Sequence, residues 1–88
     1  MKISETLLAA MTAQAESHYP EESGGLLLAS LEGDVITVMS LYPLTNVRED
    51  ARHNRIEINP LDYAKAERIA SQRGLGVWGF YHTHPNAP

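Results

Sequence analysis

The chain has 88 residues, with seven Lys and Arg against eleven Asp and Glu, which gives a formal net charge of −4. Hydrophobic residues make up 43% and charged residues 20%, a balance typical of a globular protein rather than a disordered one. The length allows one small domain, which we expect to span residues 1–88. No cluster of Lys or Arg marks a nucleic-acid-binding face, and the absence of cysteine excludes disulfides and thiolate chemistry.

The apolar residues form no segment that could serve as a membrane span or a signal peptide. The longest apolar run is 26–29, far shorter than the roughly 20 residues that a membrane helix needs. The N-terminal residues 1–15 intersperse polar residues among apolar ones, unlike the apolar core of a signal peptide. We therefore expect a soluble, cytoplasmic protein without a membrane partner.

The first half of the chain predicts one helix followed by a β-hairpin. Apolar residues at helical spacing follow Ser4, a candidate N-cap, and the helix should end before Pro20. The apolar run 26–31 predicts a buried strand, and residues 35–41 predict a second strand. The intervening Glu-Gly-Asp at 32–34 is typical of a turn.

The second half predicts a loop, a short strand, a helix and a last strand. Residues 43–54 are polar and predict a long loop, after which residues 55–58 alternate like a short strand. An Asn-Pro pair at 59–60 favours a helix start, and Gly74 favours its end. Residues 75–81 are almost entirely apolar and predict a central strand. The expected fold class is α+β, with a mixed, mostly antiparallel sheet flanked by helices.

Two histidines close this last predicted strand. Side chains alternate along a strand, so His82 and His84 should point to the same face, about 6.6 Å apart along the chain. Two imidazoles at that separation can converge on one zinc ion. Pro85 stops the strand and leaves the pair at a sheet end. A bare H-x-H motif is nevertheless a weak signal, because two histidines near an exposed strand end also arise without a metal.

A second segment carries an acidic pair just before two glycines and the first predicted strand. A carboxylate that enters a sheet beside a metal could act as a general base on water. Glu21 and Glu22 fit that description, although two glutamates after a helix are more often simply solvated. Alone, this segment decides nothing about function.

Taken together, the two segments resemble the JAMM/MPN metalloprotease family in its prokaryotic form. The family pattern combines P-x-E-x-x-G-L-L after the first helix with H-[S/T]-H-P at a later strand end. Pro20, Glu22 and residues 25–28 match the first part, and residues 79–85 match the second. Residues 55–60 are similar to the middle section of the family. The resemblance covers essentially the whole chain, and it implies a cytidine-deaminase-like layout of the sheet.

The resemblance also implies a zinc-dependent isopeptidase. By analogy, His82 and His84 are zinc ligands, and Glu22 is the catalytic residue that takes a proton from water and returns it to the leaving amine. The implied substrate is the C-terminal tail of a ubiquitin-like protein or of a small sulfur-carrier protein. Imidazole and carboxylate ligands suit zinc, but iron, cobalt and nickel bind them too.

The chain departs from the family after the second histidine. The family places a serine and an aspartate zinc ligand beyond that point, whereas Pro85, Asn86, Ala87 and Pro88 are the residues that follow here. On this basis the chain corresponds to the N-terminal portion of the family domain. We favour a piece of a longer enzyme, because a central strand needs partners on both sides. A degenerate relative and a homodimer in which a second copy supplies the third ligand remain open.

A metal-free scaffold or protein-interaction module of the same family is the alternative function. Retention of Glu22, His82 and His84 together favours the enzyme lineage. Two other histidines have simpler interpretations: His18 should interact with a helix C-terminus, and His53 should lie solvated in the polar loop. Trp78 is expected to pack in the core.

Overall fold

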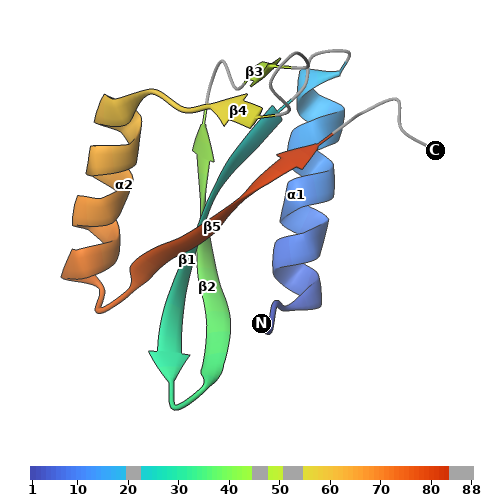
Figure 1. Cartoon of the computed structure of the whole chain (residues 1–88). Helices are drawn as coiled ribbons and strands as arrows, with labels where there is room; N and C mark the ends of the chain where they lie inside the picture. The colour runs from blue at the N-terminus through green and yellow to red at the C-terminus, as the bar shows by residue number, and fades with distance from the viewer. Residues whose placement is uncertain (20–22, 45–47, 51–54, 84–88) are drawn as a thin grey trace.

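The structure is a computed structural model that describes residues 1–19, 23–44, 48–50 and 55–83. Two helices and five strands follow one another in this part of the chain (Figure 1). They are α1 (Glu5–His18), β1 (Ser23–Glu32), β2 (Val35–Leu44), β3 (Arg48–Asp50), β4 (Arg55–Glu57), α2 (Pro60–Gln72) and β5 (Gly76–Thr83). Neither helix is long and apolar enough to cross a membrane, as far as the described residues go.

Both helices begin at the caps that the sequence predicts. The Leu7 N–H donates to Ser4 Oγ at 3.1 Å, and the Leu61 N–H donates to Asn59 Oδ1 at 2.8 Å. Each bond satisfies one of the backbone donors that a helix leaves unpaired in its first turn. After α2, Gly74 adopts a φ of 71°, a left-handed conformation that glycine takes without strain.

The main sheet has three strands in the order β2-β1-β5, and both pairings are antiparallel. β1 and β2 form a hairpin in which Glu32 pairs with Val35, and Gly33 in the turn has a φ of 62°. β5 returns along the other side of β1, so β1 is the central strand. A second, two-stranded antiparallel sheet is formed by β3 and β4. These pairings confirm the α+β class, and among the described residues the one parallel element is a single bridge between Lys2 and Thr37.

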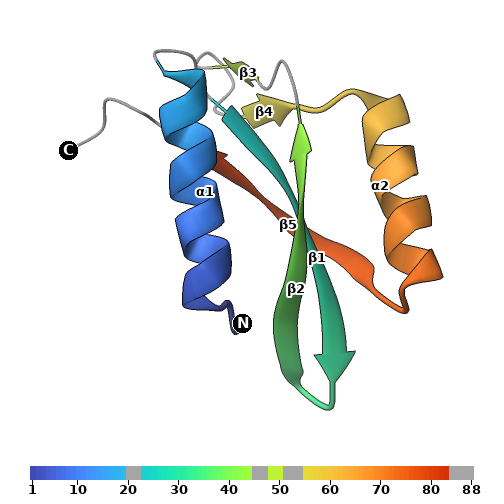
Figure 2. The same ribbon diagram turned by 180° about the vertical axis from the view of Figure 1, so that it is seen from behind.

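The two helices cover opposite faces of the main sheet, and each closes its own apolar cluster (Figures 1 and 2). The cluster under α1 contains Leu27, Ala29, Val38 and Tyr81, with Ile3, Leu7, Met11, Ile36 and Leu41 packed against it. The cluster under α2 contains Leu26, Leu44 and Ala66, with Tyr42, Ile58 and Val77 packed against it. Residues 23–29 of β1 are buried throughout, and they supply Leu26 to the cluster under α2 and Leu27 and Ala29 to the cluster under α1.

Three expectations from the sequence are wrong in the described residues. Gly76–Thr83 pairs with β1 alone and is therefore an edge strand of this sheet, not a central one. Trp78 keeps 42% of its surface exposed because it lies at an irregularity of this edge strand, where the register with β1 shifts. The predicted loop 43–54 contains the end of β2 and the strand Arg48–Asp50. Pro43 is tolerated there because β2 is itself an edge strand.

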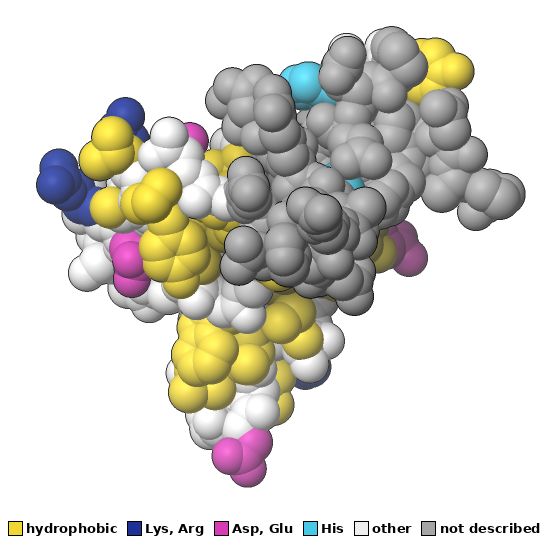
Figure 3. All heavy atoms as spheres, turned by 45° about the horizontal axis from the view of Figure 1, so that its top comes forward, with side chains coloured by type: hydrophobic (Ala, Val, Ile, Leu, Met, Phe, Trp, Pro, Cys, Tyr) yellow, Lys and Arg dark blue, Asp and Glu magenta, His cyan; other side chains and the backbone are white. Residues whose placement is uncertain are grey.

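Hydrophobic side chains also reach the surface on the hairpin and on α2 (Figure 3). Leu31 and Val35, beside the hairpin turn, are 53% and 41% exposed, and Leu61 at the start of α2 is 71% exposed. Two helices and three strands thus leave a substantial part of their apolar surface uncovered.

Candidate active site

His82 is the predicted site residue that the structure describes. It lies near the end of β5, is partly buried, and is paired with Gly24 of β1. Glu22 and His84 lie outside the described residues, as does His53. The structure therefore gives the position of one of the two predicted zinc ligands.

The register of β1 and β5 nevertheless brings the two sequence motifs to the same end of the sheet. Ser23 follows Glu22 in the chain, Thr83 precedes His84, and Ser23 and Thr83 are paired across the two strands. These paired residues are 60 positions apart in the sequence. The fold thus joins the acidic segment and the histidine segment through their immediate chain neighbours.

The side chains of Ser23 and Thr83 contact each other in the interior. Ser23 Oγ and Thr83 Oγ1 are 2.6 Å apart, and Thr83 Oγ1 also donates to the Ser23 carbonyl at 3.0 Å. Ser23 keeps only 3% of its surface exposed, so these bonds give its buried hydroxyl and carbonyl partners in place of water. The two strand ends are therefore bonded through side chains as well as through the backbone.

A second polar group ties α1 to the same strands. Tyr81 Oη donates to Gln14 Oε1 at 2.7 Å, and Gln14 Nε2 donates to the Gly24 carbonyl at 3.0 Å. Burial raises the pKa of the Tyr81 hydroxyl above its usual value of 10.0, and the bond with Gln14 opposes part of that rise. Tyr81 is therefore a neutral hydrogen-bond donor at physiological pH.

Two adjacent glycines allow β1 to approach its neighbours closely. A Cβ on Gly24 would collide with the Tyr81 carbonyl oxygen of β5. A Cβ on Gly25 would collide with the Tyr42 carbonyl oxygen of β2 and would lie 2.6 Å from Tyr81 Oη. The Gly-Gly pair is thus a packing requirement of the sheet at the point where the two motifs meet.

His82 offers an imidazole, a good zinc ligand, at the strand end where the sequence places it. Across residues 1–19, 23–44, 48–50 and 55–83, no group of three or more His, Asp or Glu side chains could hold a metal ion. One suitable donor in the described part is consistent with a site whose other donors lie elsewhere in the chain or in a second copy.

His18 has the structural role that its position predicts. It lies in the last turn of α1, where its Nδ1 is 2.9 Å from the Gln14 carbonyl and 3.1 Å from Ser17 Oγ. An imidazole in the last turn also interacts favourably with the helix dipole when it is protonated. His18 is therefore engaged within the last turn of α1 and serves as a histidine control.

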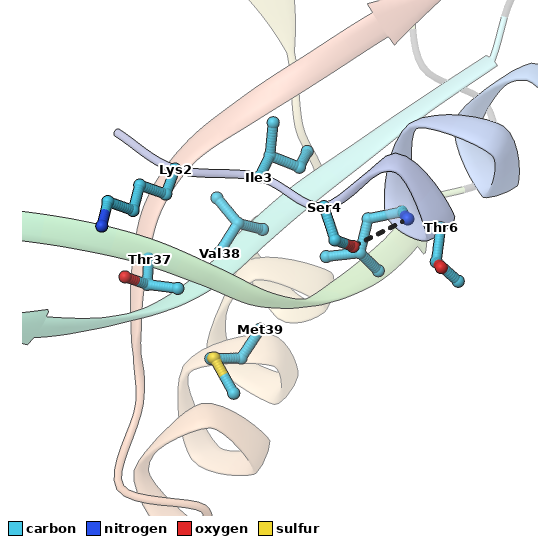
Figure 4. Close-up of a pocket in the computed structure, with 8 residues that line it drawn as sticks. Lys2, Ile3, Ser4, Thr6, Thr37, Val38 and Met39 are labelled. Atoms are coloured by element: carbon cyan, nitrogen blue, oxygen red, sulfur yellow. Dashed lines mark hydrogen bonds between the residues drawn. The ribbon is translucent and has the colours of Figure 1, made fainter.

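A groove of about 530 Å³ lies on the opposite edge of the sheet (Figure 4). Its lining comes from the N-terminal segment, the start of α1 and β2, and comprises Lys2, Ile3, Ser4, Thr6, Leu7, Thr37, Val38 and Met39. The segment is held by two backbone bonds, from Lys2 N–H to the Ile36 carbonyl and from Val38 N–H to the Lys2 carbonyl. The groove contains none of the predicted site residues.

Sequence reasoning missed the polar residues behind the predicted site, namely Gln14, Ser23, Tyr81 and Thr83. Thr83 stands between the two histidines, and this was the available signal. Because a threonine on a strand usually packs against its neighbours, its partner becomes visible only when the register of β1 and β5 is known. Gln14 gives no local signal, since a glutamine at that position suits a solvated helix face equally well.

Comparisons with known proteins bear on this architecture. A family model described as prokaryotic homologs of the JAB domain matches residues 4–88. Among solved structures, the solution structure of a protein from Salinibacter ruber (strain DSM 13855) is similar, with a TM-score of 0.66 and 33% sequence identity. The alignment covers 100% of this chain and 58% of that protein, so the chain spans little more than half the length of the relative. A search of curated proteins found no match.

The family match extends over nearly all of the chain, and the alignment with the solved structure covers the whole of this chain. The match includes both the acidic segment and the histidine segment that β1 and β5 bring together. The chain therefore belongs to the family of prokaryotic homologs of the JAB domain.

Proposed function

We propose that this chain belongs to a zinc-dependent metallopeptidase that cleaves a peptide or isopeptide bond after the C-terminal tail of a ubiquitin-like or sulfur-carrier protein. The observation that supports this proposal best is the Ser23–Thr83 pair, which joins the segment of Glu22 to the segment of His84. Family membership is the second support, because the JAB domain includes metalloproteases.

In the proposed mechanism the two histidines bind the metal and Glu22 transfers the proton. His82 and His84 would hold the zinc, which supplies Lewis-acid chemistry that polarises a carbonyl and acidifies water. Glu22 would accept a proton from the attacking water and deliver it to the leaving amine. The substrate tail is an extended chain, and an exposed sheet edge such as that of β5 can bind an extended chain through its backbone.

Metal content tests the proposal directly. We expect purified chain, loaded with zinc and dialysed, to retain zinc through His82 and His84 together with a third ligand from a second copy, because zinc sites almost always have at least three protein ligands. His82→Ala and His84→Ala should each lose most of it, whereas His18→Ala should bind like wild type because His18 serves α1. Atomic emission or mass spectrometry gives the stoichiometry.

The reverse pattern would reject the proposal. If wild type retains no zinc, or if His18→Ala loses as much as His82→Ala, the histidine pair is not a zinc site in this chain. Where zinc is retained, Glu22→Gln should keep it and abolish cleavage of a ubiquitin-like protein extended at its C-terminus. Equal cleavage by Glu22→Gln and wild type would remove Glu22 from the mechanism.

A protein-interaction module without metal is the second candidate function. The supporting observation is the outer side of β5, where Phe80 and Trp78 are 51% and 42% exposed and where no described strand pairs. Apolar exposure on an unpaired edge favours association with another chain. This candidate predicts partner binding that persists in His82→Ala, whereas zinc-dependent binding of a substrate tail would be weakened.

A further inference from the structure

The Ser23–Thr83 contact has a definite direction of hydrogen bonding. Thr83 Oγ1 carries one proton, and it donates that proton to the Ser23 carbonyl, which can only accept. The 2.6 Å bond between the hydroxyls must then be donated by Ser23 Oγ to Thr83 Oγ1. The two residues close a small ring of hydrogen bonds in which each hydroxyl proton has one acceptor. We call this pair the hydroxyl clamp.

The hydroxyl clamp lies directly beside the position of His82. His82 is paired with Gly24, which has no side chain to pack against the imidazole across the strands. Along β5 the backbone of His82 lies between two cross-strand pairs, Ser23–Thr83 on one side and Gly25–Tyr81 on the other. The first of these pairs is bonded by the clamp, and Tyr81 is anchored to Gln14 of α1.

The register of β5 decides which face of the sheet His82 occupies. Neighbouring side chains on a strand point to opposite faces, so a slip of one residue would exchange the faces of His82 and Thr83. Such a slip would take Thr83 away from Ser23 and leave a hydroxyl unsatisfied at a residue that is 3% exposed. The clamp thus opposes the slip that would misplace the histidine.

We propose that Thr83 and Ser23 are positioning residues for the candidate metal site, which hold the β5 strand end in the register that the histidine pair needs. This inference rests on the proposed function. Thr83 acts through the backbone between two predicted ligands, and its own side chain is engaged with Ser23 on the other face of the sheet from His82. The clamp therefore takes no part in the chemistry itself.

Two substitutions at Thr83 separate the hydroxyl from the shape of the side chain. Thr83→Val keeps the branched shape and loses both hydrogen bonds, whereas Thr83→Ser keeps the hydroxyl. Thr37→Val is the matched control, since Thr37 lies on β2 and its side chain makes no hydrogen bond within the described residues. Zinc affinity is measured by competition with a chromophoric chelator, with the folded fraction of each variant determined by circular dichroism under the same conditions.

We expect Thr83→Val to bind zinc at least about tenfold more weakly per folded molecule, the loss typical when a group that orients a ligand is removed. Thr83→Ser should stay within about twofold of wild type, and Thr37→Val should match wild type. Amide exchange at the end of β5 should be faster in Thr83→Val alone. Should that variant fail to fold, Ser23→Ala provides a second comparison, because it removes the hydroxyl–hydroxyl bond alone and should weaken zinc binding in the same direction.

The outcomes distinguish this inference from the proposed function. If wild type binds zinc through His82 and Thr83→Val binds it equally well, the positioning role is wrong and the metal site stands. If Thr83→Ser is as weak as Thr83→Val, the hydroxyl is not the group that matters, and the inference also fails. Absence of zinc binding by wild type overturns the proposed function, and the inference with it.

Discussion

Gly25 lies where three strands come so close that a methyl group has no room. Its replacement by alanine would press a Cβ against the Tyr42 carbonyl and against Tyr81 Oη and Cε1, the latter at 2.8 Å. We expect Gly25→Ala to reduce the free energy of unfolding by about 1–3 kcal/mol, the usual cost of overpacking a core. Denaturant unfolding measures it.

Gly79→Ala is the matched control for this prediction. A Cβ at Gly79 would meet Leu27 Cδ1 at 3.5 Å, an ordinary van der Waals contact. We expect this variant to unfold within about 0.5 kcal/mol of wild type, as conservative changes without a clash usually do. Equal destabilisation by both substitutions would show that the close approach at Gly25 is not what limits its side chain.

Tyr81 links stability to alkaline pH. Its pKa is raised in the folded state, chiefly by burial, so the unfolded chain loses the proton at a lower pH than the folded protein does. The stabilisation is therefore complete below about pH 10, the unfolded value, and is lost as the pH rises through the folded-state pKa.

We expect the free energy of unfolding to fall above about pH 10 by more in wild type than in Tyr81→Phe, a comparison made by urea unfolding at each pH. At neutral pH the variant should be less stable by about 1 kcal/mol, since it loses the bond to Gln14. Parallel pH curves for the two proteins would contradict the role of Tyr81.

At the level of single elements, Ser4 sets the beginning of α1. Its hydroxyl accepts from the Leu7 N–H, and α1 has no fully buried residue to compensate for a lost cap. Ser4→Ala should lower the free energy of unfolding by about 1 kcal/mol, and Ser4→Asp should restore most of it because aspartate caps equally well. Thermal unfolding of the three proteins gives the comparison, and a wild-type melting curve for Ser4→Ala would show that the cap adds nothing.

How far an element could be predicted depended on how local its determinants are. Ser4 caps α1 and Asn59 caps α2, and both helix starts were predicted because a cap is a property of a few consecutive residues. The position of β5 at the edge of the sheet was not predicted, because an apolar strand has the same sequence pattern whether it has one neighbour or two. The expectation that Trp78 packs in the core was wrong for the same reason.

The candidate site divides in a similar way. His82 could be recognised because an H-x-H spacing and a family pattern identify ligands by residue type. The hydroxyl clamp could not be recognised from the sequence, because it depends on the pairing of Ser23 with a residue 60 positions away. Alternation along β5 does predict that Thr83 faces away from His82, but only the strand register says what it meets there.

For the molecule as a whole, the main consequence of this topology is an edge strand without charge. β5 contains no Lys, Arg, Asp or Glu, the residues that commonly prevent strands from pairing between molecules. We expect the purified chain to self-associate as its concentration rises, and Phe80→Lys to shift it toward monomer, measured by sedimentation velocity.

Met39→Lys is the control for this experiment. Met39 is 57% exposed on β2, the opposite edge, where Lys2 already forms a bridge with Thr37. The Met39→Lys variant should associate like wild type. A wild-type chain that stays monomeric at all concentrations, or equal effects of the two lysines, would show that the edge of β5 is not an association surface.

The long separation between Ser23 and Thr83 also bears on the order of folding. The β1–β2 hairpin closes through a short turn and needs few residues, whereas β5 can dock only after α2 and the intervening chain have been brought back to β1. Contacts of such large sequence separation are characteristic of late steps in folding. We therefore expect substitutions in the hairpin to slow folding, and substitutions in the hydroxyl clamp chiefly to accelerate unfolding. A chain that has formed its hairpin has not yet formed its candidate site, so the site comes into existence only when β5 joins the main sheet.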